Sequence, residues 1–386
     1  MIRATREEIP SPLETGSFFL QGNEACADGA VLAGCDFYGG YPITPSSEVM
    51  TRILARFGKT GGRFLQMEDE IASIAAVIGA AWAGARALTA TSGPGFSLML
   101  ENLGYAIMTE TPMVLVDAQR VGPATGQATR PAQGDVMQAR WGTHGGFPLI
   151  AVCPSSVQEM LTETIRAFNL AEKYRTPVIV LADEIVAHLR ERCVLPERVV
   201  RWRRWFERGR DPFGPSDDAL VPSMPRFGDG EKLMITGSTH DRTGLRKTDS
   251  AQAQAELGAR LHAKIEAGRD DIVEVDRYFT DDAETVLVSF GFSARPSRDV
   301  MRYRRVAGEK IGLLKLRTLW PFPEKEVREA CGRARRVVVV EMNDGQIVHE
   351  VRRVLGRSDV VSCTRHDGEP LSPENVEACL RRTKAA

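Results

Sequence analysis

The chain has 386 residues, enough for two or three domains that each bury a hydrophobic core. Its 50 lysines and arginines are balanced by 51 aspartates and glutamates, which argues against binding to nucleic acid or to an anionic membrane surface. The N-terminal apolar runs are too short for a signal peptide or a membrane-spanning helix, so we expect a cytoplasmic protein.

The cysteines and histidines of this chain lack the clustering that metal sites require. Its seven cysteines are scattered and form no C-x-x-C pair, and its six histidines show no metal-ligand spacing. We therefore expect reduced core thiols, and neither a metal ion nor an iron–sulfur cluster held by this chain alone.

The sequence divides into four segments. Residues 1–16 are polar and are expected to form an N-terminal arm, and residues 17–195 alternate short apolar runs with helical patterns, as in a parallel α/β domain. Residues 196–283 break this rhythm and are expected to form an irregular connection. Residues 284–386 are expected to form a second α/β domain.

In chain order, the first domain is predicted to contain strands at 36–40, 64–67, 87–91, 113–117, 149–152 and 178–182. Helices are predicted at 25–34, 46–57, 69–83, 97–108 and 157–173. The strand at 64–67 is expected to be buried, and the helix at 69–83 is expected to bury a face at three- and four-residue spacing, made of Ile71, Ile74, Ile78 and Trp82.

After this domain the arginine-rich run 198–210 is interpreted as a solvated linker, followed by a charged helix at 252–268. The second domain is predicted to contain strands at 286–289, 311–316 and 336–341. Helices are predicted between and after them at 293–307, 324–332 and 345–355.

A rigid turn follows the first predicted strand. Thr44 lies between Pro42 and Pro45, and proline fixes its own φ and also favours an extended conformation in the residue before it. A hydroxyl held this firmly, with glycines before it, suits a small polar ligand.

Three acidic residues, Glu68, Asp69 and Glu70, begin the helix at 69–83. Acidic residues in a first helical turn often only complement the helix dipole. Here, however, they follow a strand end in the domain that holds the Thr44 turn, and ligands bind at the carboxyl ends of parallel strands.

The run Thr91-Ser92-Gly93-Pro94-Gly95 joins a strand to a helix. Its glycines allow the backbone to approach a flat ligand closely, although an ordinary capped turn has the same composition. It matches neither a phosphate-binding loop with Gly-Lys-Ser/Thr nor the dinucleotide G-x-G-x-x-G pattern.

Arg120 is predicted just past a strand end, before a loop rich in glycine and proline. Its guanidinium could bind a carboxylate through two parallel hydrogen bonds. His144 is a further candidate polar contact, although an isolated histidine is more often structural.

These motifs, in this order, resemble the alpha subunit of the 2-oxoacid:ferredoxin oxidoreductases, and most closely the 2-oxoglutarate enzymes. The likeness covers nearly the whole chain and rests on ordered runs that include Gly40-Tyr41-Pro42-Ile43-Thr44-Pro45, Gln66-Met67-Glu68-Asp69-Glu70, Thr91-Ser92-Gly93-Pro94-Gly95 and Gln138-Ala139-Arg140-Trp141-Gly142-Thr143-His144. It implies a pyrimidine-binding domain of thiamine-diphosphate enzymes, followed by a transketolase C-terminal-like domain.

The resemblance also implies roles for single residues. Glu70 would hydrogen-bond the aminopyrimidine ring of thiamine diphosphate, with Glu68 and Asp69 as fallback assignments, and Thr44 and Arg120 would orient the 2-oxoacid, with His144 as a further substrate contact. The other residues implied to contact the cofactor are Tyr41, Pro42, Ile43, Ser92, Gly93 and Gly95.

As in separate alpha subunits of the family, the cluster cysteines and the diphosphate–magnesium motif are missing. The resemblance thus implies half an active site, completed by a beta subunit that carries the diphosphate contacts, Mg²⁺ and a [4Fe–4S] cluster. Gamma and delta subunits can complete such a complex, with coenzyme A and ferredoxin as further reaction partners.

The expected reaction is oxidative decarboxylation of 2-oxoglutarate with coenzyme A, or its reversal. Two alternatives remain open: an enzyme for pyruvate or a branched-chain 2-oxoacid, and a non-catalytic scaffold subunit. Buried polar residues at the Thr44, Glu70 and Arg120 positions argue against the scaffold, which has no use for buried polar groups that cost stability when unpaired.

Overall fold

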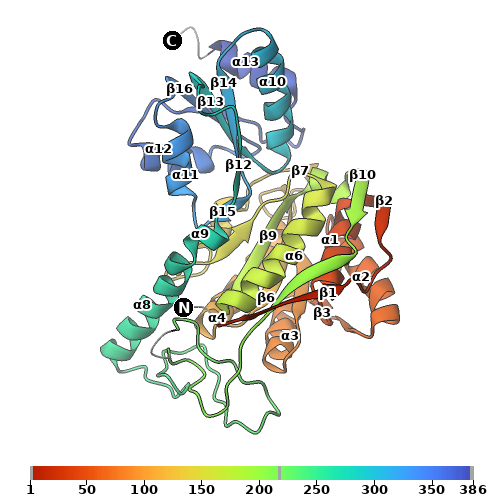
Figure 1. The fold of residues 1–386 in the computed structure, drawn as a ribbon, viewed down its shortest axis with the longest axis vertical. Coiled ribbons are helices and arrows are strands. Elements are labelled where there is room, and N and C mark those ends of the chain that lie inside the picture. The colour runs from red at the N-terminus through yellow and green to blue at the C-terminus, as the bar shows by residue number, and fades with distance from the viewer. Residues whose placement is uncertain (1–2, 216–218, 383–386) are drawn as a thin grey trace.

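Two parallel-rich sheets organise the chain in the computed structural model, which describes residues 3–215 and 219–382 (Figure 1). The first sheet has the strand order β15-β8-β9-β6-β5-β3-β4, and β7 pairs with β6 off this path. Its parallel strands are β3 (Phe37–Gly40), β4 (Arg63–Gln66), β5 (Ala87–Thr91), β6 (Met113–Val121), β8 (Ile150–Val152) and β9 (Pro177–Asp183).

Helices cover both faces of the first sheet, as expected for a buried parallel sheet. On one face, a core cluster joins the sheet to α1 (Gly22–Leu32), α2 (Ser47–Thr60) and α6 (Val157–Tyr174). On the other face, a second cluster joins it to α3 (Glu70–Trp82), α4 (Gly93–Met108) and α5 (Val136–Trp141).

The chain reverses its direction across this sheet at β3. From β3 it passes through α2 to β4 on one side, and then through α3 to β5 on the other side of β3. The two helices lie on opposite faces, so the carboxyl ends of β3 and β5 lie at a topological switch point, the place where ligands of open α/β sheets bind.

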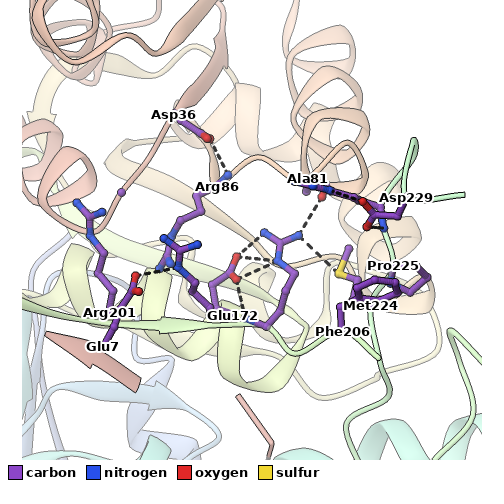
Figure 2. Close-up of a pocket in the computed structure, with 15 residues that line it drawn as sticks. Glu7, Asp36, Ala81, Arg86, Glu172, Arg201, Phe206, Met224, Pro225 and Asp229 are labelled. Atoms are coloured by element: carbon purple, nitrogen blue, oxygen red, sulfur yellow. Dashed lines mark hydrogen bonds and ion pairs between the residues drawn. The ribbon is translucent and has the colours of Figure 1, made fainter. Parts of the chain in front are cut away.

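A cavity of about 570 Å³ with many charged residues lies at the opposite, amino edge of the sheet (Figure 2). Its central carboxylate, Glu172 of α6, accepts hydrogen bonds from the backbone N–H of Arg204 at 3.0 Å and from Arg204 Nε at 2.9 Å. Arg204 also donates to the carbonyl oxygens of Ala81 and Ala85 at the end of α3 and just beyond it. This arrangement fastens α6 to α3.

The second sheet has the order β12-β14-β13-β16-β17 and lies above the first in Figure 1. Only β12 (Val275–Tyr278) runs antiparallel to its neighbour, while β13 (Thr285–Phe290), β14 (Ile311–Leu316), β16 (Arg336–Glu341) and β17 (Val361–Thr364) are parallel. Its helices are α10 (Ala294–Val306), α11 (Glu324–Cys331), α12 (Ile347–Leu355) and α13 (Pro373–Arg382), and η1 (Gly291–Ser293) precedes α10.

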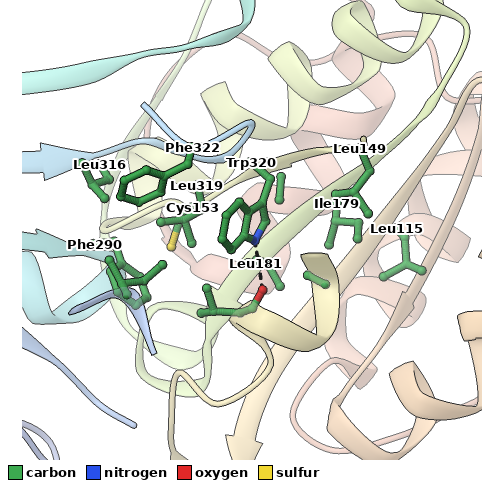
Figure 3. Close-up of a cluster of buried hydrophobic side chains, with 14 of the residues drawn as sticks. Leu115, Leu149, Cys153, Ile179, Leu181, Phe290, Leu316, Leu319, Trp320 and Phe322 are labelled. Carbon is green, nitrogen blue, oxygen red and sulfur yellow. Dashed lines mark hydrogen bonds between the residues drawn. The ribbon is translucent and has the colours of Figure 1, made fainter. Parts of the chain in front are cut away.

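The two α/β units share one apolar core at their junction (Figure 3). Leu115 and Ile179 from the first sheet belong to the same cluster as Phe290 and Trp320 from the second unit. The strand β15 (Thr318–Trp320) joins the edge of the first sheet, and Trp320 Nε1 donates to the carbonyl oxygen of Val136 at 2.9 Å. The second unit is therefore part of the packing that supports the first.

Two antiparallel pairs complete the first unit: β1 (Thr5–Pro10) with β11 (Arg198–Arg203), and β2 (Gly16–Gln21) with β10 (Arg190–Leu195). The remaining elements are β7 (Gln127–Pro131), α7 (Glu184–His188), α8 (Ala251–Ala267) and α9 (Arg269–Ile272). The buried carboxylate of Glu110 binds Arg260 and Lys264 and so anchors α8.

The α/β fold class and all of the predicted strands are confirmed, but several details of the prediction are wrong. The strand at 64–67 is not buried, because β4 is an edge strand with mostly exposed residues. Ile71 is 48% exposed, and Ser73 and Val77 are buried with Ile74, Ile78 and Trp82. The run at 198–210 is no solvated linker, since it contains β11 and the largely buried Arg204.

The limits of the four predicted segments, at residues 16, 195 and 283, stay a prediction. Segment 1–16 contains β1, and segment 196–283 contains β11, α8, α9 and β12 in addition to irregular chain. All seven cysteines are buried and unbridged, which agrees with core thiols. Among the helices that the structure describes, none is long and apolar enough to cross a membrane.

Candidate active site at the carboxyl edge of the first sheet

The turn that follows β3 is held from several sides. The Thr44–Pro45 peptide bond is cis, and the carbonyl oxygen of Pro45 accepts a hydrogen bond from Asn23 Nδ2 at 2.6 Å. The hydroxyl of Ser46 donates to the carbonyl oxygen of Ile43 at 3.0 Å. Thr44 itself is exposed rather than buried as expected, because it lies at the outer side of the turn, so a fixed backbone presents this residue to solvent or to a ligand.

Glu70 is the one buried member of the acidic triplet. Glu68 is exposed, and Asp69 is the N-cap of α3, where its carboxylate accepts from the backbone N–H of Ala72 at 2.7 Å. Glu70 follows as the first helical residue and is 5% exposed. Burial raises the pKa of its carboxyl, and the charge of Arg120 acts in the opposite direction.

Arg120 connects β6 to the Thr44 turn. It was predicted just past a strand end, but β6 extends to Val121 and Arg120 lies inside it, 7% exposed. Its Nη1 donates to the carbonyl oxygen of Thr44 at 2.6 Å, while its buried Nε has no partner in the described structure. The structure therefore brings Thr44, Arg120 and Glu70 to the same edge of the sheet.

Helix α4 begins four residues earlier than predicted, so the glycine-rich run forms its first turn rather than a loop. Ser92 is the N-cap, but its side chain makes no capping hydrogen bond. A Cβ placed on Gly95 would lie 2.2 Å from Thr91 Oγ1 and 2.4 Å from Glu70 Oε1. Glycine is thus the residue that leaves space for the Glu70 carboxyl at this position.

Buried hydroxyls without partners gather at the same edge. The side-chain oxygens of Thr89, Thr91 and Ser92 are shielded and have no hydrogen-bond partner in the described structure. Buried polar groups normally find partners, so such a group of hydroxyls indicates a place where a polar ligand completes the contacts.

The other predicted site residues lie at two places. Tyr41, Pro42 and Ile43 precede Thr44 in the same turn, and Tyr41 is 39% exposed. His144 follows α5 and is exposed; it lines a cavity of about 470 Å³ with Tyr105 in the C-terminal half of α4. The structure therefore places His144 beside the far half of α4 and not beside Glu70.

Two carboxyl groups near the start of α4 were not predicted from the sequence. Asp117 of β6 is fully buried and faces Asp135, the N-cap of α5. Gln119 lies on the same face of β6 as Asp117, and its Oε1 accepts from the backbone N–H of Asp135 at 3.1 Å. Alternation along the strand could have paired Asp117 with Gln119, whereas nothing local indicated Asp135.

Two family descriptions match this chain. The one described as "Pyruvate flavodoxin/ferredoxin oxidoreductase, thiamine diP-bdg" matches residues 28–258, and "Pyruvate:ferredoxin oxidoreductase core domain II" matches residues 283–376. The chain belongs to the 2-oxoacid:ferredoxin oxidoreductase family. Its first unit is a thiamine-diphosphate-binding domain, and the family resemblance noted from the sequence is confirmed.

Curated relatives from two branches of this family match the chain, and the 2-oxoglutarate synthase subunits are more similar to it than the ketoisovalerate oxidoreductase subunits. The chain is 48% identical to "2-oxoglutarate synthase subunit KorA" of Methanothermobacter marburgensis over 94% of this chain and 98% of the relative. It is 37% identical to "Ketoisovalerate oxidoreductase subunit VorB" of Methanothermobacter thermautotrophicus, over 94% of this chain and 96% of the relative.

A solved structure has the same fold over nearly the whole chain. The 2-oxoglutarate:ferredoxin oxidoreductase from Magnetococcus marinus, solved with 2-oxoglutarate, coenzyme A and succinyl-CoA bound, matches with a TM-score of 0.90 and 31% identity. The match covers 96% of this chain and 65% of that chain. A split-gene transketolase, 13% identical with a TM-score of 0.52 over 95% of this chain and 98% of its own, shares the fold alone.

The carboxyl edge fits the thiamine ring system. Glu70 offers a buried carboxyl, Gly95 keeps the space beside it open, and the unpartnered hydroxyls of Thr91 and Ser92 supply further polar contacts. In the described residues, no group of His, Cys, Asp or Glu is arranged to hold a metal ion.

Proposed function

We propose that this chain is the alpha subunit of a 2-oxoglutarate:ferredoxin oxidoreductase. The complex would convert 2-oxoglutarate and coenzyme A to succinyl-CoA and CO₂ and pass electrons to ferredoxin, or run the reverse carboxylation. The observation that carries this proposal is the buried Glu70 beside the Arg120–Thr44 contact, in a chain that is 48% identical to a 2-oxoglutarate synthase subunit.

Thiamine diphosphate, when bound, supplies the electron sink for breaking the bond between the keto carbon and the carboxylate carbon of the 2-oxoacid. Glu70 would donate or accept a proton at the pyrimidine ring nitrogen. Its raised pKa suits this role, because a carboxyl with a raised pKa can hold a proton near neutral pH and also release it. The backbone and side chains of Tyr41, Pro42, Ile43, Ser92, Gly93 and Gly95 would line the cofactor.

Thr44 and Arg120 would bind the 2-oxoacid. The hydroxyl of Thr44 is exposed on a fixed turn, and the Arg120 guanidinium has a nitrogen to spare for a carboxylate. His144 lies beside the C-terminal half of α4, away from Glu70. If it contacts a substrate, it would contact a part that lies away from the reacting keto group.

A beta subunit would complete the site. Several apolar side chains at or near this edge are exposed, which is typical of a surface that a partner covers: Tyr41, Leu65, Ile71 and Leu98. The small residues of α3 would allow that partner close contact. We propose that the beta subunit brings the diphosphate contacts, Mg²⁺ and the [4Fe–4S] cluster, with gamma and delta subunits as further members.

We also propose that the complex works in the cytoplasm, the kind of compartment in which free buried thiols such as these seven stay reduced.

The direct test is an assay of the chain together with its beta subunit on a panel of 2-oxoacids, with coenzyme A and ferredoxin present. We expect the highest kcat/KM with 2-oxoglutarate, and little turnover by the alpha chain alone. A higher kcat/KM with pyruvate or a branched-chain 2-oxoacid would overturn the substrate assignment, and full turnover without a partner would overturn the shared site.

A further inference from the structure

Two carboxyl groups face each other behind the first turn of α4. Asp117 lies on β6 and is fully buried, and Asp135 precedes α5 with its Oδ2 shielded from solvent. The two carboxyl groups lie close enough to interact, and Asp117 Oδ1, Asp117 Oδ2 and Asp135 Oδ2 have no hydrogen-bond partner on any other residue in the described structure. A hydrogen bond between two carboxyl groups requires a proton on one of them.

This carboxyl pair touches three elements of the site. The backbone N–H of Gly93, in the first turn of α4, acts to lower the pKa of Asp117, and a Cβ placed on Gly93 would lie 3.7 Å from Asp135 Oδ2. The backbone N–H of Asp135, at the start of α5, donates to Gln119 Oε1 on β6. Arg120, the next residue of β6, lies close enough for its charge to act on Asp135.

The electrostatics favour a single shared proton. Burial raises the pKa of Asp117 well above its usual range, and the facing carboxyl of Asp135 raises it further. Burial raises the pKa of Asp135 to about 6, although Asp117 and Arg120 both act to lower it. Two like charges in contact in a buried place cannot both persist, so the pair carries one negative charge at neutral pH.

Other charged groups on the neighbouring elements are engaged elsewhere. Asp183 of β9, opposite Gln119 in the register, accepts from Gln133 Nε2 at 3.1 Å and from the backbone N–H groups of Phe292 and Val186. Glu70 of α3 feels the charge of Asp69 and Arg120. Arg120 is therefore the charged side chain whose field acts on the pair.

We propose that Asp117 and Asp135 are positioning residues, and that the proton they share holds the first turn of α4 and the end of β6 in the arrangement that the cofactor and the 2-oxoacid require. This inference rests on the proposed function. Neither carboxyl would touch the reacting atoms; each would act through Gly93 of α4 or through Gln119 and Arg120 of β6.

The test uses the complex of the alpha and beta subunits and measures the affinity for thiamine diphosphate against pH by calorimetry. Asp117→Asn keeps the contact between the two side chains, since its amide N–H₂ can donate to Asp135, but it has no proton to lose. We expect wild-type affinity to fall at high pH, where the pair gains a second charge, and Asp117→Asn to remove that fall. Asp117→Ala should weaken binding about tenfold at every pH, because it leaves the shielded Asp135 carboxyl without the group that faces it.

Asp183→Asn is the matched control, because Asp183 is an equally buried aspartate with a pKa of about 6 that contacts different groups. It should keep the wild-type fall at high pH. The proposal is overturned if Asp117→Asn retains that fall, or if Asp117→Asn and Asp117→Ala weaken binding equally at neutral pH.

Two measurements on the alpha chain alone do not depend on the substrate. Infrared spectra at a pH well above 6 should show a protonated carboxyl band that shifts in D₂O, persists in Asp183→Asn and is absent in Asp117→Asn. Stability should also decline as the pH rises above about 4, since the folded chain keeps a proton that the unfolded chain has lost, and Asp117→Asn should flatten this decline. Absence of the band in wild type would overturn the shared proton. Failure of the 2-oxoacid assay alone would overturn only the proposed function.

Discussion

At the amino edge of the first sheet, the side chain and backbone of Arg204 donate hydrogen bonds to the buried carboxylate of Glu172. At the carboxyl edge, Arg120 donates to the backbone carbonyl of Thr44 and not to the buried carboxyl of Glu70. Burial acts to raise the pKa of both carboxyls. For Glu172, Arg204 and Arg86 outweigh burial and the pKa falls, while for Glu70 burial prevails and the pKa rises.

The comparison separates buried charge that stabilises the fold from buried charge that is available for chemistry. At the amino edge, Arg204 and Glu172 form an ion pair in which both side chains are largely buried. At the carboxyl edge, carboxyls with raised pKa values lie among hydroxyls that have no partner. Perturbed groups of this kind cluster at functional sites.

Glu70→Gln should have the largest effect on this comparison. The amide cannot exchange a proton with the cofactor ring, so turnover of the alpha–beta complex should fall about 10²–10⁴-fold, the usual contribution of a general acid or base. Size-exclusion chromatography should show intact assembly. Turnover near the wild-type rate would mean that Glu70 is misassigned or that the subunit is a scaffold.

Glu172→Ala should affect stability instead. Removing one partner of a buried ion pair leaves Arg204 uncompensated, which costs about 3–5 kcal/mol of unfolding free energy. Denaturant unfolding measures this, with Glu369→Ala as the control, since its pair with Arg130 is exposed and contributes little. If Glu172→Ala lowered kcat/KM of the folded complex without loss of stability, the division between the two edges would fail.

Gly95→Ala should have a smaller effect on activity than Glu70→Gln. The new methyl group would collide with Thr91 Oγ1 and push the Glu70 carboxyl aside, and a misplacement of about 1 Å can cost about 10²-fold in rate. Gly104→Ala in the same helix is the matched control, because its methyl group would meet only Thr143 at 3.6 Å. Equal rates for the two variants would contradict the tight fit at Gly95.

The sequence predicted what local pattern determines. The strands and helices of both units follow apolar periodicity, and the Thr44 turn and the Glu70 helix start carry their own capping and proline signals. The predicted strand ended at Asp117 because Gln119 and Arg120 look like a polar loop in sequence, yet both are buried and lie within β6.

The remaining errors come from tertiary contacts. Nothing near Asp135 in sequence indicates that its carboxyl interacts with that of Asp117, and nothing near Thr318 indicates that β15 joins the first sheet. Ile71 has the spacing of a core residue, but it lies in the first turn of α3 at the sheet edge, where the described chain does not cover it. Periodicity reports one face of a helix and cannot show where the packing around it ends.

The central claim is that the buried Glu70 carboxyl acts on the thiamine ring. Deuterium exchange at the thiazolium C2 position of bound thiamine diphosphate, followed by NMR in the alpha–beta complex, measures that action before any substrate binds. The account predicts that Glu70→Gln slows this exchange about 10²–10⁴-fold while the cofactor stays bound. Exchange at the wild-type rate in the cofactor-loaded variant would contradict it.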